Sequence, residues 1–369
     1  MLRIFLLNTD YPAFLRWLYR SRPSRVVASY GAQLRARNAS LFGTADFMSV
    51  HLKAAGHDAI DVHANNRPMQ EAWLGRRRGI LARLAGIPRR RPLILPPSEP
   101  RFYDILEAQI RDYRPDIIYN HDPGAVPAER LAALKPADCR LVAQIAAPLE
   151  PGIEWRRYDL VISSLPNYVD TFRRQGVTAA YLPLAFDDRI LEHVRPDARD
   201  VGFSFVGSLF DEHGERRRLL EHVAARCPIE IWGHGRERLA PDSPIASRHR
   251  GVAWGRTMYD VIARSRLSLN KHIDISATYA NNMRLFEATG VGALLLTDAK
   301  DNLGDLFEPG REVIAYHSAE QCVDLARYYL EHDGERQRIA AAGQARCLRD
   351  HSYRRRMTQL SALLQRHFG

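Results

Sequence analysis

The sequence has no apolar run near the roughly 20 residues that a membrane-spanning helix needs. Its start, Met1–Leu7, is too short for a signal peptide and fits a first β-strand better. There is also no internal repeat and no low-complexity tract. We therefore expect a cytoplasmic protein rather than a membrane-spanning or secreted one.

Cysteine is scarce as well. The only four cysteines, at positions 139, 227, 322 and 347, are too widely separated for a zinc or redox motif, and we expect free thiols. The chain has 369 residues, 46% of them hydrophobic and 26% charged, which is typical of a globular protein with two domains.

Acidic residues are outnumbered: 53 Lys and Arg against 43 Asp and Glu give a formal net charge of +10. Such a balance suits anionic partners, including a phospholipid surface, a lipid diphosphate or a nucleotide sugar. No nucleic-acid reading motif is present, so we expect no nucleic acid partner. The stretch from Leu74 to Pro92 interleaves arginines with Ile80, Leu81, Leu84 and Ile87. It predicts either a basic amphipathic helix on an anionic membrane or a solvated surface insertion.

Strand patterns alternate with helix patterns along the chain, which predicts an α/β protein with doubly wound parallel sheets. A polar connection between Pro183 and Val201 is the expected hinge. We expect an N-terminal domain over 1–185, a second domain over 186–350, and a C-terminal helix over 351–369. The predicted strands are 2–7, 59–63, 116–120, 141–145, 160–163, 180–182, 202–206, 229–232, 267–270, 293–296 and 313–315. The predicted helices are 39–55, 103–113, 125–134, 167–174, 212–225, 257–264, 281–289, 319–331 and 353–368.

The helix predicted at 281–289 has an unusually polar face, with Asn281, Arg284 and Glu287 at three-residue spacing. A carboxylate at Glu287 can accept hydrogen bonds from the two hydroxyls of a ribose. Arg284 and the N–H groups at the helix start can hold a phosphate. The alternative is a surface ion pair between Arg284 and Glu287, worth only a few tenths of a kcal/mol.

Several motifs occur in the same order as in one family. They are Phe203–Leu209, Glu230–Gly233, Ser268–His272, Asn281–Gly290 and Leu303–Glu312, with Asn8–Pro12 and His63–Asn66 nearer the start. Together they resemble the CgeB-like branch of the group 1 glycosyltransferases. The resemblance implies the GT-B architecture: two Rossmann-like domains facing across a cleft, with the C-terminal helix crossing back to the first domain. It also implies that the second domain holds most of the donor, a nucleotide diphosphate sugar.

In open parallel sheets, ligands bind beyond the carboxyl ends of the strands, so the polar residues there are candidates for donor contacts. Glycine backbone can approach a diphosphate closely, an arginine can pair with it, and an aromatic wall can border a base. The alternatives are ordinary turns and, for the tryptophan, core packing. The predicted donor-binding residues are Gly207, Ser208, Arg217, Trp232, Gly233, Asn270, His272, Asn281, Asn282, Arg284 and Glu287.

The sequence departs from the wider superfamily at one position. Many retaining members carry two glutamates separated by seven residues; Glu287 matches the second, but Tyr279 stands at the position of the first. The stereochemistry of transfer therefore stays open. No Asp-x-Asp motif is present. Since GT-B enzymes generally bind the diphosphate with protein groups alone, we expect no cofactor and no essential metal.

A direct-displacement transfer that inverts needs a general base on the acceptor side. Asp10, His121 and Asp122 are the candidate catalytic residues, and His63 is a further one. The alternative is that Asp10 caps a helix and Asp122 makes a turn. We expect a glycosyltransferase whose acceptor is a glycan, a lipid-linked sugar or a surface polymer. A nucleotide-sugar epimerase and a non-catalytic binding or coat-assembly protein are the alternatives.

Overall fold

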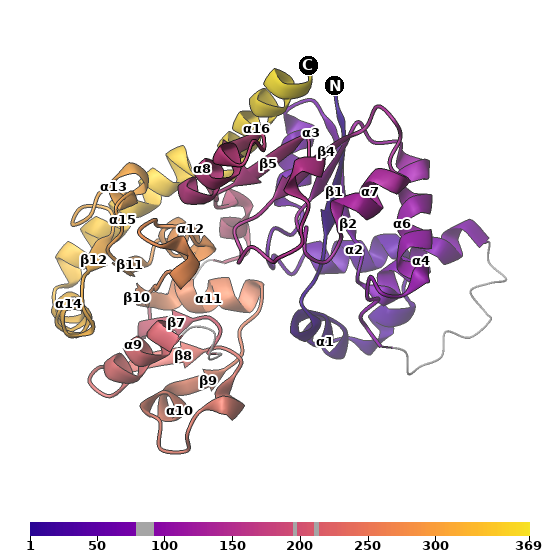
Figure 1. The fold of residues 1–369 in the computed structure, drawn as a ribbon. Helices are drawn as coiled ribbons and strands as arrows, with labels where there is room; N and C mark the ends of the chain where they lie inside the picture. Colours follow the sequence, from indigo (N-terminus) through magenta and orange to yellow (C-terminus); the bar gives the residue numbers. More distant parts are fainter. Residues whose placement is uncertain (79–91, 195–197, 210–213) are drawn as a thin grey trace. The chain divides into compact units, whose positions relative to one another are not determined.

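The computed structural model describes residues 1–78, 92–194, 198–209 and 214–369 (Figure 1). The chain divides into two compact units, Met1–Leu182 with Met357–Gly369 (unit 1) and Pro183–Arg356 (unit 2). Each unit contains one six-stranded sheet in which all strand pairs are parallel. The predicted α/β, doubly wound fold class is confirmed. Within the described ranges, no helix is both long and apolar enough to span a membrane.

The sheet of unit 1 has the strand order β2-β1-β3-β4-β5-β6. The chain runs to one side of β1 to form β2 and to the other side to form the remaining strands, so the topological switch point lies between β1 and β3. The strands are β1 (Arg3–Asn8), β2 (Asp58–His63), β3 (Ile117–Asn120), β4 (Arg140–Gln144), β5 (Leu160–Ser163) and β6 (Ala179–Tyr181).

The helices of unit 1 flank this sheet (Figure 1). They are α1 (Pro12–Arg20), α2 (Tyr30–Asn38), α3 (Phe47–Ala54), α4 (Arg67–Arg78), α6 (Pro100–Tyr113), α7 (Ala128–Leu134) and α8 (Pro166–Arg174), with short 3-10 turns at Pro23–Val27 and Trp155–Arg157. The last helix, α16 (Tyr353–Phe368), joins unit 1 from Met357 onward. His57 and Ser361 fix it there with a 2.7 Å hydrogen bond between the ring Nε2 and the hydroxyl.

The sheet of unit 2 has the order β12-β11-β10-β7-β8-β9, which places its switch point between β7 and β10. Its strands are β7 (Val201–Val206), β8 (Ile229–Trp232), β9 (His249–Gly251), β10 (Ser265–Leu269), β11 (Leu294–Asp298) and β12 (Ile314–Tyr316). Its helices are α9 (Gly214–Ala224), α10 (Pro244–Arg248), α11 (Arg256–Arg264), α12 (Met283–Gly290), α13 (Leu303–Leu306), α14 (Ala319–Glu331) and α15 (Asp333–Asp350), with 3-10 turns at Asp188–Glu192, Arg236–Arg238 and Asp274–Ser276.

The central strands of unit 2 carry large apolar side chains on one face and small side chains on the other. Phe203, Phe205 and Leu267 pack with α9 and α14 in one buried cluster. Because strand side chains alternate, Ser204 and Ser268 point to the opposite face, and both are fully buried. Both faces of these strands are therefore buried, as is usual for a parallel sheet that is covered by helices.

All four cysteines are free and buried. Burial raises the pKa of each thiol, to about 11 at Cys139 and about 12 at Cys347. They therefore act as small apolar core residues, as the sequence predicted.

Some predicted elements are wrong in extent. The helix predicted over 39–55 is only α3, because Leu41, Gly43 and Ala45 adopt positive φ angles of 59°, 62° and 42°, which a right-handed helix cannot contain. Helix α12 begins at Met283 rather than Asn281, since Asn282 is its N-cap. The prediction also did not include helices α1, α2, α4, α10, α13 and α15 or strand β9.

Most of the Leu74–Pro92 stretch lies outside the described residues, which omit 79–91, so its membrane role stays a prediction.

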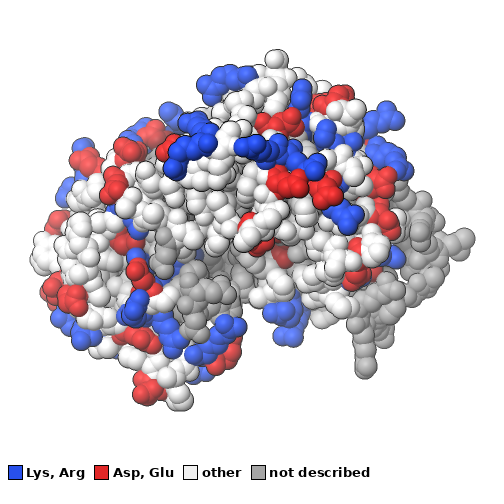
Figure 2. Space-filling view, in the orientation of Figure 1, with Lys and Arg blue, Asp and Glu red and all other residues white. Residues whose placement is uncertain are grey.

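On the face shown in Figure 2, acidic side chains lie among the basic ones. The net charge of +10 is therefore not concentrated on that face as one uniform basic patch.

Helix α15 packs closely only at one of its two glycines. A Cβ on Gly343 would lie 2.2 Å from the carbonyl oxygen of Glu312, whereas a Cβ on Gly334 would meet nothing within 4 Å. Gly343→Ala should therefore lower the free energy of unfolding by about 1–3 kcal/mol through overpacking. Gly334→Ala, the matched control in the same helix, should leave it unchanged or raise it by up to about 1 kcal/mol. Urea unfolding measures both, and equal stabilities would show that the contact at Gly343 imposes no constraint.

Candidate functional site

The polar residues at the carboxyl end of the unit 2 sheet form a connected network. The side-chain amide of Asn270 donates to the Thr297 hydroxyl at 2.9 Å, and that of Asn282 donates to the side-chain Oδ1 of Asn270 at 2.7 Å. The side-chain Oδ1 of Asn282 also accepts the backbone N–H of Leu285 at 3.0 Å, which caps α12. Two predicted site residues, Asn270 and Asn282, are thus brought together at the start of α12. Asn281, which directly precedes the cap, is 6% exposed.

Asp298, at the end of β11, organises the neighbouring loop. It accepts hydrogen bonds from the backbone N–H of His272 at 2.9 Å and from the ring Nδ1 at 2.7 Å, and it pairs with Lys271 at 3.1 Å. Burial would raise the pKa of Asp298, but His272 and Lys271 outweigh it and hold the pKa well below its usual range. The ring Nε2 of His272 has no hydrogen-bond partner among the described residues, although the side chain is 1% exposed.

Arg284 and Glu287 do form the ion pair that the sequence offered as an alternative, with 2.8 Å between Nη1 and Oε2. It is not a surface pair, because their side chains are only 13% and 6% exposed. The Tyr259 hydroxyl donates to Glu287 at 3.2 Å, and the Nη2 of Arg284 donates to the Val206 carbonyl at 3.0 Å. The Nε of Arg284 has no hydrogen-bond partner among the described residues. A buried charged donor without a partner is costly, which indicates a site for an anionic ligand.

The loops after β7 and β8 meet at glycine backbone. A Cβ on Gly233 would lie 1.8 Å from the carbonyl oxygen of Gly207, so no side chain fits there. The N–H of Gly207 donates to the Trp232 carbonyl at 2.9 Å. Ser208 follows directly and is half-buried. Of the two predicted glycines, Gly233 is therefore required by the close packing of the two loops, whereas a Cβ on Gly207 would lie 2.8 Å from the ring of Phe205.

The donor contact expected of Arg217 stays a prediction. Arg217 lies 3.4 Å from Glu221 in the same helix, an ordinary pair four residues apart. Arg216 instead donates to the Lys271 carbonyl at 3.3 Å, so Arg216 is the arginine of α9 that lies beside the loop after β10. Helical geometry explains the difference, because the side chains of successive residues point in directions about 100° apart around the helix axis.

One aromatic pair was missed. The rings of His234 and Trp254 stack with centroids 5.1 Å apart and an interplanar angle of 14°. Trp232, the predicted aromatic wall, is itself half-buried. The Trp-Gly-His-Gly motif drew attention to the backbone at 232–235, but no local signal connects His234 with a tryptophan twenty residues later.

In unit 1 the candidate catalytic residues lie after β1 and β3, at the switch point. The Asp10 carboxylate accepts from Nη2 of Arg37 at 2.8 Å and lies 3.4 Å from Nδ1 of His63. Burial would raise the pKa of Asp10, but Arg37 and His63 hold it well below its usual range. A buried carboxylate that is already paired is a weak base, so the geometry assigns Asp10 to holding this site together. Both nitrogens of His63 lack a hydrogen-bond partner among the described residues.

Asp122 has the contacts of a turn residue, as the sequence alternative held. It accepts the N–H of Ala125 at 3.1 Å and the hydroxyl of Thr9, which ties the loop after β3 to the loop after β1. His121 is different: its side chain is half-buried, and its imidazole hydrogen-bonds to no described residue. Desolvation lowers the pKa of His121 to about 4, so the ring is neutral near pH 7 and is a weak base. Of the three predicted catalytic residues, His121 has the free basic atom.

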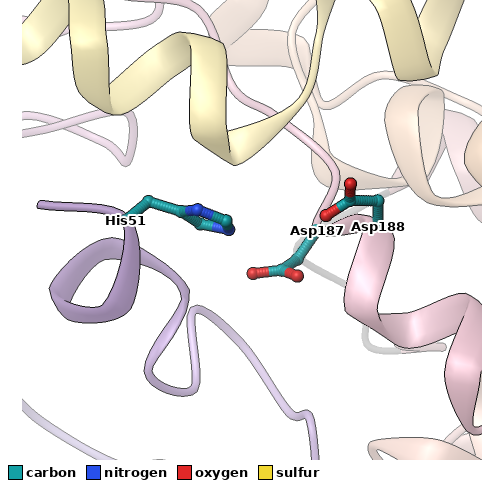
Figure 3. Close-up of side chains that lie close together, drawn as sticks. All are labelled: His51, Asp187 and Asp188. Atoms are coloured by element: carbon teal, nitrogen blue, oxygen red, sulfur yellow. The ribbon is translucent and has the colours of Figure 1, made fainter. Parts of the chain in front are cut away.

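Neither unit by itself brings together three metal-ligating side chains among the described residues. Figure 3 shows Asp187 and Asp188 at the 3-10 turn Asp188–Glu192 of unit 2, together with His51 of unit 1. Asp187 is already paired within unit 2, where Arg189 contacts its two carboxylate oxygens at 2.9 and 2.8 Å. Because His51 belongs to the other unit, these residues carry no metal assignment.

Residues 215–362 match the family described as glycosyl transferase-like. This segment runs from α9 into α16 and contains Asn270, Asn282, Arg284 and Glu287. A comparison with curated proteins found no significant match.

Solved glycosyltransferases share the whole fold. Sucrose-phosphate synthase from Thermosynechococcus elongatus has a TM-score of 0.61 at 12% identity, covering 100% of this chain and 99% of that one. HepE from Anabaena, solved in complex with UDP and glucose, has a TM-score of 0.59 at 13% identity, covering 99% and 100%. AviGT4, involved in avilamycin A biosynthesis, has a TM-score of 0.57 at 14% identity, covering 100% and 98%. At these identities the likeness shows the GT-B fold, which agrees with the sequence prediction of a glycosyltransferase.

The low pKa of His121 predicts a pH-dependent stability. Its pKa is about 4 in the folded protein against 6.5 for an ordinary histidine, so the unfolded chain binds the proton more tightly. This stabilisation is complete above pH 6.5 and is lost as the pH falls toward 4, by at most about 1.4 kcal/mol per pH unit. His121→Gln should make the pH dependence of urea unfolding shallower in this window. His193→Gln, a control whose exposed side chain stays in water in both states, should not. An unchanged slope for His121→Gln would contradict the assignment.

Proposed function

We propose that the protein is a glycosyltransferase that moves a sugar from a nucleoside diphosphate sugar to an acceptor hydroxyl. One observation carries the proposal: in unit 2 the buried Glu287–Arg284 pair lies beside the glycine backbone after β7, at the switch point of a parallel sheet. The glycosyl transferase-like match over 215–362 contains this constellation. HepE, which shares the fold, has been solved with UDP and with UDP-glucose.

Unit 2 has the chemistry for each part of such a donor. Glu287 can accept hydrogen bonds from the ribose hydroxyls, since a carboxylate offers several lone pairs. The unused Nε of Arg284 and the start of α12, capped by Asn282, can stabilise the diphosphate. Glycine backbone at Gly207 and Gly233, with the His234–Trp254 pair after β8 and β9, can border the base.

In the proposed reaction, the acceptor oxygen forms a bond to the anomeric carbon while the bond from that carbon to the phosphate oxygen breaks. The nucleoside diphosphate leaves with the electron pair, and its negative charge is stabilised by Arg284 and the α12 N-terminus. If the reaction inverts, His121 in unit 1 takes the acceptor proton, because its imidazole is neutral and has no partner among the described residues.

Finer assignments belong to the same proposal. The motif order supports a CgeB-like bacterial enzyme of hexosyltransferase type that acts in the cytoplasm. The cationic groups at the donor site support transfer without an essential metal. The net charge of +10 supports an acceptor at an anionic surface, with peripheral membrane contact through Leu74–Pro92. The acceptor is then a glycan, a lipid-linked sugar or a surface polymer.

A donor-turnover assay tests the proposal. The protein is incubated with UDP-, GDP-, dTDP- and ADP-sugars, with and without EDTA, and products are separated by chromatography. Release of a nucleoside diphosphate and free or transferred sugar supports a transferase, and EDTA resistance supports metal independence. An isomerised donor would show an epimerase, and intact donors throughout would leave a binding protein.

Glu287→Gln tests the ribose contact. Gln keeps an oxygen that can accept from Tyr259 but loses the charge, so the affinity for nucleoside diphosphate should fall by about 1.5–3 kcal/mol. Isothermal titration measures it, with a melting curve to confirm folding. Glu221→Gln, which removes the exposed partner of Arg217, is the matched control and should bind normally. Normal affinity in Glu287→Gln would rule out the ribose assignment.

Arg284→Ala tests the phosphate contact. The variant should lose far more affinity for the nucleoside diphosphate than for the free nucleoside, because only the diphosphate forms a charge-assisted pair with the guanidinium. Both ligands are titrated against the same preparation, so partial loss of fold affects both equally. An equal loss for both ligands would place Arg284 away from the phosphates.

A further inference from the structure

Unit 1 contains a pocket that the proposed transfer does not use. Its volume is about 340 Å³, at the lower end of the roughly 300–1,000 Å³ range of small-molecule sites. It lies along β2, the edge strand of the sheet, between residues of α2, α3, α4 and α6. None of Asp10, His121 and Asp122 lines it. The pocket is therefore separate from the candidate catalytic residues after β1 and β3.

The pocket contains buried polar atoms without partners. Gln109 of α6 is only 4% exposed, yet neither its amide nitrogen nor its amide oxygen is hydrogen-bonded to a described residue. The side-chain oxygen of Asn38 in α2 is also buried and unpartnered. Leaving an amide in this state costs free energy, so a group that both donates and accepts is expected opposite Gln109.

A carboxylate completes the polar wall. Asp61 of β2 is 8% exposed and accepts a hydrogen bond from the Ser49 hydroxyl. Burial raises the pKa of the Asp61 carboxyl, and Ser49 and the nearby charges of His63 and Arg37 offset that rise only in part. The remaining lone pairs of Asp61 can accept from a hydroxyl.

The lining also contains three aromatic side chains, Tyr30, Trp73 and Tyr113, which come from three different helices. Aromatic faces carry a negative potential and attract weakly positive C–H groups, which the rings of sugars present on their flat sides. The charged residues around the pocket have both signs, Arg3 and Lys53 against Asp46 and Asp112. This mixture gives no preference for an anion such as a free phosphate.

We infer that this pocket binds one neutral sugar residue, with its hydroxyls on Gln109, Asn38 and Asp61 and its ring against the aromatic side chains. A sugar residue supplies hydroxyls that donate and accept at once, which the amide of Gln109 requires. Under the proposed function, this residue belongs to the acceptor glycan and holds it on unit 1. Binding of the sugar itself does not require transfer.

Fluorine NMR of protein labelled with 5-fluorotryptophan tests the inference directly. The chain has five tryptophans, and Trp73→Phe identifies the resonance of Trp73. The probes are the methyl glycosides of glucose, galactose, mannose, N-acetylglucosamine, rhamnose and xylose. At least one should shift the Trp73 resonance saturably, with a millimolar Kd, as expected for a ligand of about a dozen heavy atoms. No saturable shift with any probe would overturn the inference.

Gln109→Met separates a binding role from a structural one. Methionine has a similar volume and no groups that need hydrogen bonds, so the melting temperature should stay the same or rise. Sugar affinity should fall by at least about tenfold. Gln175→Ala, an exposed glutamine of the same unit, should bind normally. Unchanged sugar affinity in Gln109→Met, or a marked loss of stability, would show that Gln109 does not serve a sugar.

The outcome is independent of the donor assay. A saturable Trp73 shift with no donor turnover would support sugar binding in the pocket and contradict the transferase proposal. Turnover without any shift would support the transferase proposal and contradict sugar binding in the pocket.

Discussion

The side chain of Arg284 joins three parts of unit 2. It pairs with Glu287 one turn along α12, donates to the carbonyl of Val206 at the end of β7, and lies 3.3 Å from the sulfur of Met258 in α11. Most of this contact is buried, where a charge is stable only with partners. The same charge that could hold a diphosphate therefore fixes α12 against the strand end that precedes Gly207. Both the position of α12 and the proposed binding of the diphosphate depend on the guanidinium of Arg284.

Unit 1 also has a buried charged group that connects neighbouring segments, but there it is the carboxylate of Asp10. Asp10 is held by Arg37, and the loop after β1 is tied to the loop after β3 through Thr9 and Asp122. Asp10 Oδ2 and both ring nitrogens of His63 have no hydrogen-bond partner among the described residues, and no described residue hydrogen-bonds to the His121 imidazole. The His121 imidazole is neutral near pH 7 and offers a nitrogen to an acceptor hydroxyl, whereas the paired carboxylates hold the two loops together.

The sequence predicted the fold class because strand patterns alternate with helix patterns along the chain, and β5, β8 and α16 match their predicted ranges. It predicted α12 two residues too long because an asparagine before a helix resembles its first turn in sequence. It missed α15, whose alanines and charged residues give a weak apolar pattern. The candidate site residues within one loop or helix were predicted from spacing. Tyr259, Asp298 and the His234–Trp254 pair were not, because their contacts join segments far apart in the chain and only packing brings them together.

The burial of every native thiol has a practical consequence. Thiolates, not thiols, react with alkylating and oxidising reagents, and here each cysteine is both enclosed and shifted toward its protonated form. We therefore expect the native cysteines of the folded protein to react slowly with maleimides and mild oxidants. A single cysteine introduced on the surface of either unit would be the one reactive position, so spectroscopic labels can be attached to the otherwise native chain.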